Sequence, residues 1–166
     1  MTIEHPYTDL TGGSWVLGNL HAHTTRSDGK RPAQEVLDDY AARGYDFLML
    51  SDHDVFTGAQ EYAALQSRGL VLIPGNEITA AGPHMLHVNA ERRIEPHADR
   101  QRAISQAVDA GGFVILNHPN WMQLFDHFPI AQMQNLTGYT GMAIYNGVIG
   151  RRMGSCYALD KWDLLL

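Results

Sequence analysis

Short apolar runs alternate with amphipathic segments along this chain, and the alternation predicts an α/β fold. The runs at residues 47–50, 70–73 and 113–116 are continuously apolar, as in parallel strands that are covered on both faces. Residues 15–17 lead into another candidate strand, and residues 142–145 form a weaker one. Segments with helical spacing lie between them, at residues 33–44, 59–69 and about 97–110, each ending at glycine. This recurring order is typical of βα units.

Side chains that bind metals follow the predicted strands. In chain order these are His21 and His23, the run from Asp52 to Asp54, Glu77, His84 and His118. Because the loops beyond the carboxyl ends of parallel strands converge, residues far apart in the sequence are expected to meet there. The pattern therefore predicts one shared polar site at that edge of the sheet.

The residue types at this edge indicate a metal site. Imidazoles and carboxylates bind divalent ions such as zinc, iron and manganese, whereas Cys156 is the only cysteine and cannot form a closed cysteine-zinc site. The spacing of His21 and His23 places both side chains on the same side of an extended strand.

Each motif alone has a structural alternative. Asp28 precedes Gly29 and fits a turn, Asp52 could be a helix N-cap, Glu77 could be a solvated loop acid, and His118 could be a buried packing residue. Their common position at strand ends favours a metal centre. The histidines outside this pattern are assigned to surface or packing roles: His5, His97 and His127.

Composition limits the class of protein. A length of 166 residues with 45% hydrophobic content predicts a single domain over residues 1–166. The net charge of -6 and the absence of a basic stripe argue against a nucleic-acid polymer as partner. No signal peptide is recognised, and no apolar run reaches the roughly 18 residues of a membrane span. With a single cysteine, these features predict a cytoplasmic protein without a membrane partner.

Four motifs together resemble the PHP superfamily, the polymerase and histidinol phosphatase metallohydrolases. They are HAHTTRSDG at residues 21–29, LSDHD at 50–54, GNE at 75–77 and NHP at 117–119, with a histidine between the last two. The resemblance covers roughly residues 18–161. The loop EITAAGPHMLHVN is most similar to the CehA/McbA-like branch.

The resemblance implies an incomplete, distorted (β/α)7 TIM-like barrel with two or three divalent ions, of zinc, manganese or iron. The implied ligands are His21 and His23 with Glu77 at one ion, Glu77 with His84 and His118 at a second, and Asp28 with His53 at another. His87 competes with His84 for its role, and the family loop favours His84.

Two departures from the family pattern stand out. The family carries an Asp-x-His pair on its last strand, and no such pair follows Asn146. The sequence ends on three leucines within a predicted helix, so we expect the chain to be a fragment that lacks its last strand and ligands. Such a fragment would expose an unpaired strand edge and apolar surface, and we therefore expect it to self-associate. The second departure is Ala143, which stands where members of the family often carry a glutamate.

The resemblance implies a metal-dependent phosphoesterase that hydrolyses a small phosphorylated substrate with a metal-activated water. Asp52 and Asp54 are candidates to orient His53 or to move a proton. Arg26, with Lys30 or Arg31, is a candidate to hold phosphate, the alternative being solvated surface charge. Two other functions stay open: a metal-dependent amide or carbamate hydrolase, and a non-catalytic metal-binding domain that lacks the Asp-x-His motif.

Overall fold

The computed structural model describes residues 13–166, so His5 lies outside the described residues. The elements in chain order are β1 (Gly18–Ala22), α1 (Ala33–Ala42), β2 (Phe47–Leu50), α2 (Ala59–Ala63), β3 (Val71–Leu72), β4 (Gly75–Ile78), β5 (Met85–Val88), α3 (Arg100–Asp109), β6 (Phe113–Leu116), α4 (Ile130–Asn135), β7 (Gly141–Met142), the 3-10 turn η1 (Ile149–Arg151) and α5 (Leu159–Leu165). Within the described range, no helix has the length and apolar character needed to cross a bilayer.

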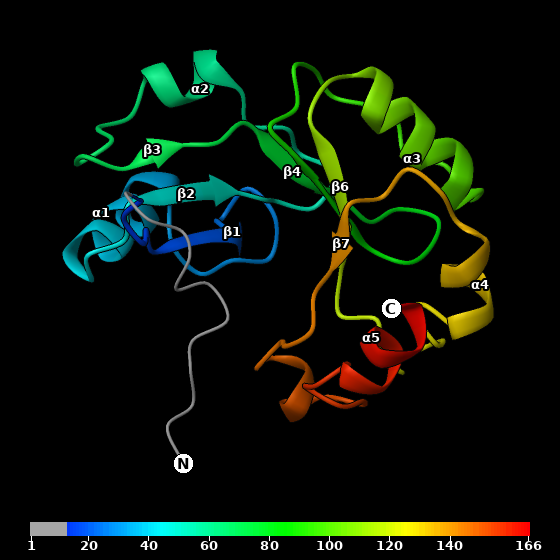
Figure 1. The fold of residues 1–166 in the computed structure, drawn as a ribbon. Coiled ribbons are helices and arrows are strands. Elements are labelled where there is room, and N and C mark those ends of the chain that lie inside the picture. The colour runs from blue at the N-terminus through cyan, green and yellow to red at the C-terminus, as the bar shows by residue number, and fades with distance from the viewer. Residues whose placement is uncertain (1–12) are drawn as a thin grey trace.

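The strands form two sheets rather than one (Figure 1). The first is parallel in the order β1-β2-β3, and the second has the order β4-β5-β6-β7. The predicted α/β class is confirmed. The expectation of uniformly parallel strands is wrong, because β5 runs antiparallel to both β4 and β6. Over residues 13–166 the strands do not close into a barrel.

The antiparallel pair β4–β5 was not predicted from the sequence. Glu77 belongs to β4 and faces Leu86 of β5 in the register, whereas the sequence placed it in a loop after a strand. Only residues 79–84 connect the two strands. A connection this short joins antiparallel neighbours, because a parallel crossover needs about a dozen residues or more.

Two predicted helices match α1 and α3 closely, but α2 is much shorter than the predicted 59–69. The side-chain amide of Gln34 in α1 explains why α2 ends before residue 66. Its side chain accepts a hydrogen bond from the backbone N–H of Gln66 at 2.8 Å and donates one to the carbonyl of the same residue at 3.0 Å. This contact between elements replaces the intrahelical bonds that residue 66 would otherwise make.

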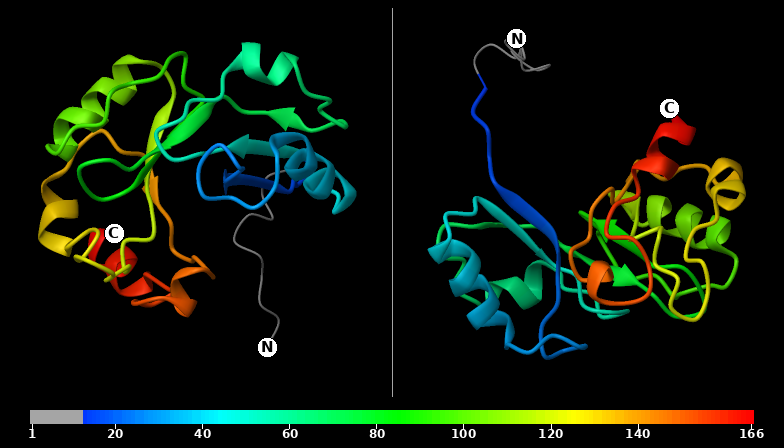
Figure 2. Two further views of the ribbon diagram at one scale, coloured as in Figure 1. Left: turned by 180° about the vertical axis from the view of Figure 1, so that it is seen from behind. Right: turned by 90° about the horizontal axis from the view of Figure 1, so that it is seen from below.

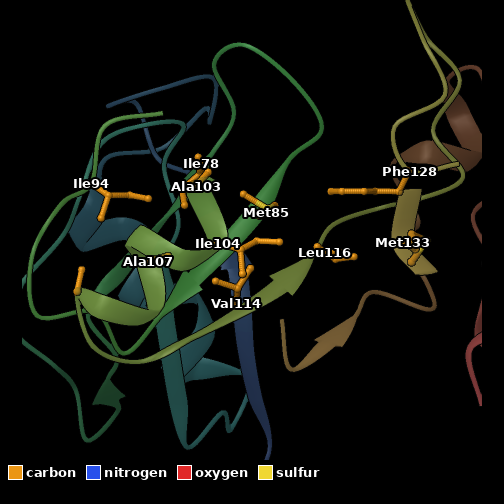
Figure 3. Packing of buried hydrophobic residues seen from close by; sticks show 11 residues of the cluster. Ile78, Met85, Ile94, Ala103, Ile104, Ala107, Val114, Leu116, Phe128 and Met133 are labelled. Atoms are coloured by element: carbon orange, nitrogen blue, oxygen red, sulfur yellow. The ribbon is translucent and has the colours of Figure 1, made fainter. Parts of the chain in front are cut away.

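Three apolar clusters hold the elements together. Side chains of α1 pack on β1 and β2, around Leu37 and Leu48. Side chains of α3 pack on β4, β5 and β6, around Ile104 and Val114 (Figure 3). A third cluster around Met49 combines residues of β2 with residues of β5 and β6, and so joins the two sheets. Figure 2 shows the resulting arrangement, with α1 and α2 on one side of the molecule and α3 on the other.

Candidate metal centre

The carboxylate of Glu77 is fully buried and faces five imidazoles. Its backbone is fixed on both sides, because β4 pairs with β5 and also forms an isolated bridge to His53. The closest nitrogen-to-oxygen distances are 3.4 Å for His21, 3.2 Å for His23, 2.9 Å for His53, 3.5 Å for His84 and 3.3 Å for His118. These residues come from β1 and the residue after it, from the loop after β2, from the residue just before β5 and from the loop after β6. The predicted convergence is therefore present.

Several of these polar atoms are buried without a hydrogen-bond partner in residues 13–166. They are His23 Nε2, His53 Nδ1, His84 Nδ1 and Glu77 Oε2. His53 Nδ1 lies only 2.9 Å from Glu77 Oε2, yet the pair lacks hydrogen-bond geometry. Nitrogen and oxygen lone pairs that crowd together without bonding one another are the arrangement expected of ligands directed at a shared cation. The donor set fits a divalent metal ion.

The loop after β1 holds Asp28 beside this cluster. Asp28 Oδ1 lies 2.7 Å from Nδ1 of His23 and 3.6 Å from Nε2 of His53. The loop is also a turn, in which the backbone N–H of Gly29 donates to the carbonyl of Thr24. A Cβ on Gly29 would lie 2.4 Å from the carbonyl oxygen of His23, so only glycine fits this close approach. The turn interpretation of Asp28 and its place in the cluster are therefore compatible.

Asp52 and Asp54 hold loops in place. The buried carboxylate of Asp52 accepts hydrogen bonds from the backbone and hydroxyl of Thr24 and from the hydroxyl of Ser27. Asp54 has a φ of 54° and accepts from the backbone N–H groups of Thr79 and Ala80. These contacts position the loops that carry Asp28 and the residues after Glu77, whereas the sequence suggested that the two acids act on His53.

Charge compensation explains the shifted pKa values in the cluster. Burial would raise the pKa of Glu77, but the imidazoles of His118, His21 and His23 hold it well below its usual range. Burial opposes the charging of His23, yet the carboxylates of Glu77 and Asp28 raise its pKa to about 9. The same balance raises the pKa of His53. The cluster thus requires positive charge, which either protons or a bound cation can provide.

The structure brings His84, and not His87, to Glu77. His84 stands just before β5 and its Nδ1 lies 3.5 Å from the carboxylate. His87 belongs to β5, and its Nε2 lies 2.8 Å from the backbone carbonyl of Gly111. The preference for His84 drawn from the family loop agrees with this placement.

His127 is a residue of the site that sequence reasoning missed. It is 2% exposed, and its ring lies 4.7 Å from that of His84 and 5.2 Å from that of His118. Burial and the charges of these two histidines lower the pKa of His127 to about 4. Backbone groups of Phe125 and Trp121 are near enough to affect this pKa, but none makes a well-formed hydrogen bond to the ring. His97, by contrast, is partly exposed and accepts a hydrogen bond from the N–H of Asp99, as a surface residue.

A cleft of about 720 Å³ opens onto the cluster. Residues of β1 and of the segment after β7 line its walls, and Trp121 and Arg152 line it as well. The guanidinium of Arg152 lies 5.6 Å from the centre of the Trp121 ring. Arg26 is not among the lining residues, and its guanidinium donates to Thr57 Oγ1 and to the carbonyl of Phe56. These contacts favour a structural role for Arg26.

Two solved structures define the fold type. A two-domain protein from Bacteroides vulgatus that contains a predicted PHP-like metal-dependent phosphoesterase superposes with a TM-score of 0.53 at 23% identity, over 75% of this chain and 39% of that chain. A protein from Bifidobacterium adolescentis, named for metal-dependent phosphoesterase activity, gives a TM-score of 0.57 at 17% identity, over 78% of this chain and 77% of that chain. The fold is PHP-like. The predicted resemblance is thereby confirmed, while the CehA/McbA-like branch stays a prediction.

The PHP-like fold also matches an amidohydrolase from Chromobacterium violaceum solved with sulfate and no metal, with a TM-score of 0.59 at 18% identity, over 89% of this chain and 80% of that chain. In sequence, 72 residues are 39% identical to a 3',5'-nucleoside bisphosphate phosphatase from Chromobacterium violaceum. That match covers 42% of this chain and 25% of the relative's length. No family model matches the chain.

Proposed function

We propose that this chain is a metal-dependent phosphoesterase that hydrolyses a small phosphorylated substrate. The observation that carries the proposal is the buried Glu77 carboxylate, which faces five imidazoles, three of which direct a buried nitrogen without a hydrogen-bond partner towards it. The name of the bisphosphate phosphatase relative and the PHP-like fold support a phosphate ester as the substrate class.

The proposed ligands fall into three groups, each with a carboxylate and at least one histidine. His21 and His23 with Glu77 would hold one ion, Glu77 with His84 and His118 a second, and Asp28 with His53 another. Zinc, manganese and iron all suit such mixed nitrogen and oxygen ligands. Divalent ions in a site of this kind activate water for attack and stabilise charge on a phosphoryl group.

The residues of the chain have separate tasks in this proposal. Asn117 Nδ2 donates to Glu77 Oε1 at 2.5 Å and fixes the orientation of the carboxylate. When Nδ1 of His23 donates to Asp28, Nε2 keeps its lone pair on the side of Glu77. Asp52 holds the loop that carries Asp28. Together these contacts orient the ligands before any ion or substrate binds.

The two sheets support a further proposal on architecture. We infer that they are parts of a distorted PHP-type barrel that is open between β1 and β7. The helices α1 and α3 pack on the faces turned away from the cleft, and residues of β1 and β7 both line the cleft, as at the mouth of an unclosed barrel. A single domain over residues 1–166 is part of this proposal, because the Met49 cluster joins the two sheets.

A second candidate function is the hydrolysis of an amide or carbamate. The amidohydrolase name of one structural neighbour favours it, and the same ligands serve either reaction. Activity of the metal-loaded chain on p-nitrophenyl phosphate and a nucleoside 3',5'-bisphosphate, compared with that on an aryl carbamate, separates the two. We expect release of phosphate only. Turnover of the carbamate alone would replace the first proposal by the second.

Metal content tests the ligand set directly. Glu77→Gln removes the carboxylate charge at nearly constant volume, and we expect it to lower the metal content and to abolish turnover, because Glu77 is shared by two of the proposed ion positions. His87→Gln is the matched control, since it changes a histidine of β5 that contacts Gly111 and not Glu77. Metal analysis after dialysis gives the readout. A wild-type chain that binds no manganese or zinc would contradict the proposed metal centre, and with it the non-catalytic metal-binding alternative.

A further inference from the structure

His127 is a buried histidine whose surroundings the Glu77 cluster does not explain. It lies in the loop between β6 and α4 and is 2% exposed. Neither ring nitrogen has a hydrogen-bond partner in residues 13–166. A buried polar group without a partner costs about 1–3 kcal/mol. A histidine at this position is therefore best accounted for by a ligand that its nitrogens bind.

Two aromatic rings hold the imidazole of His127 in place. The ring of Phe125 stacks on it at 4.5 Å with an interplanar angle of 6°, and that of Trp121 stacks at 4.4 Å with an angle of 27°. The backbone N–H of His127 also donates to the carbonyl of Trp121. Stacking occupies the faces of the imidazole, whereas its lone pairs lie in the ring plane. The contacts thus fix the ring and leave the nitrogens at its edge free to bind.

Two other histidines stand next to it. The rings of His84 and His118 meet that of His127 edge to face, at interplanar angles of 75° and 66°. One ligand nitrogen from each of the three residues lies within 4.8 Å of the others. Nitrogens on one tetrahedral zinc ion are about 3.3 Å apart, so nitrogens that lie within 4.8 Å of one another need to approach by no more than about 1.5 Å.

We propose that His84, His118 and His127 form a three-nitrogen site that selects a borderline ion such as zinc. This inference rests on the proposed metal centre, because His84 and His118 belong to both. With His127 added, the ion held by His84 and His118 would have three neutral imidazoles and only the shared Glu77 carboxylate, and this nitrogen-rich set favours zinc over manganese, which prefers oxygen ligands. The positions nearer His21, His53 and Asp28 keep their carboxylate ligands and bind either ion. The metal centre would then have a zinc-selective position beside His127 and less selective positions beside His21, His53 and Asp28.

His127→Phe is the decisive variant. Phenylalanine keeps the stacking on Phe125 and Trp121 and removes both nitrogens. Zinc and manganese affinities of the full 166-residue chain, first stripped of metal, are measured by competition with a chromophoric chelator. We expect zinc affinity at this site to fall at least about tenfold, while manganese affinity does not change. His97→Gln is the matched control, because this histidine lies outside the cluster and contacts Asp99.

The outcomes separate this inference from the proposed function. Unchanged zinc affinity in folded His127→Phe overturns the inference and leaves the phosphoesterase proposal intact. Unchanged metal binding in Glu77→Gln contradicts the proposed metal centre instead. If circular dichroism shows that His127→Phe does not fold, imidazole 15N NMR of the wild-type chain decides the question. A shift of the His127 ring resonances on addition of zinc chloride supports the site, and unaltered resonances overturn it.

Discussion

Arg26 and Arg152 differ in whether the fold already uses the guanidinium group or leaves it available for a substrate. Arg26 is already bonded to Thr57 and Phe56, and it does not line the cleft. Arg152 lines the cleft, is exposed and makes a single ring contact, with Trp121. A guanidinium binds phosphate oxygens in a fork geometry. Arg152 is the cation that lines this cleft, and we expect it to contact a phosphorylated substrate.

Arg152→Gln is expected to raise KM for a phosphate ester about five- to tenfold with little change in kcat, since a charge-assisted hydrogen bond at an exposed position contributes about 1 kcal/mol. Steady-state kinetics at saturating metal provide the measurement. Arg102→Gln, on the outer helix α3, is the control and should behave as the wild type. A fall in kcat at constant KM would contradict a role in binding.

At the residue scale the sequence predicted which side chains would gather, but not how each of them is placed. His21, His23, His53 and His118 lie at or after the carboxyl ends of strands, as expected. Glu77 lies inside β4 and His84 stands before the antiparallel strand β5, so strand ends alone do not account for these two residues. His127 carries no such signal, since it stands in the middle of a long loop and only the folding of that loop brings it to His84. Its spacing from Trp121 and Phe125, a cluster of aromatic residues in one loop, is the one hint the sequence offered.

Among the elements, the strands that carry the site differ most from expectation. The segments that form β4 and β5 read GNEI and MLHV, so each is short and contains a polar residue in a buried position. Patterns of apolar residues do not distinguish such strands from loops. The antiparallel pairing is nevertheless what places Glu77 opposite Leu86 and leaves His84 at the start of the next strand, beside the carboxylate.

Tyr62 of the short helix α2 provides a test of how side-chain hydrogen bonds connect β2 with the segment after β3. Its hydroxyl accepts a hydrogen bond from the N–H of Leu50 and donates one to the carbonyl of Ile73, and so connects β2 with the segment after β3. We expect Tyr62→Phe to lower the free energy of unfolding by about 1–3 kcal/mol, because both backbone groups lose a partner. Urea denaturation followed by circular dichroism measures the change.

Tyr45→Phe is the comparison for this variant, since it keeps the ring contact of Tyr45 with Tyr40 at 4.7 Å. Its free energy of unfolding should stay within about 0.5 kcal/mol of the wild type. An equal decrease in the free energy of unfolding of both variants would show that the hydrogen bonds of the Tyr62 hydroxyl do not stabilise the strands specifically.

Across the whole molecule, the cleft depends on contacts between distant parts of the chain. The Met49 cluster joins the two sheets, while helix α5 contacts α4. The sequence predicted the α/β class from its alternating pattern, but no local pattern shows the division into two sheets or the reversal of β5 within the second sheet. Self-association through exposed edges stays a prediction.

Lys161 links α5 to the loop that carries the three-histidine site. Its buried ammonium group donates to the backbone carbonyls of Pro119 and Phe128, both at 2.6 Å, and to the carboxylate of Asp126 at 3.1 Å. These acceptors bracket residues 119–128, the part of the loop that contains Trp121 and His127. One cation therefore fixes both ends of this segment to the last helix.

Lys161→Met keeps most of the volume and removes all three donors. We expect the free energy of unfolding to fall by about 1–3 kcal/mol, because two buried carbonyls are left without partners. The near-ultraviolet circular dichroism of the aromatic residues should weaken as the loop loosens, and zinc affinity should fall more than manganese affinity. Lys30→Met, at the other and exposed lysine of the sequence, should change none of these. Loss of stability with zinc affinity intact would show that α5 supports the fold without positioning His127.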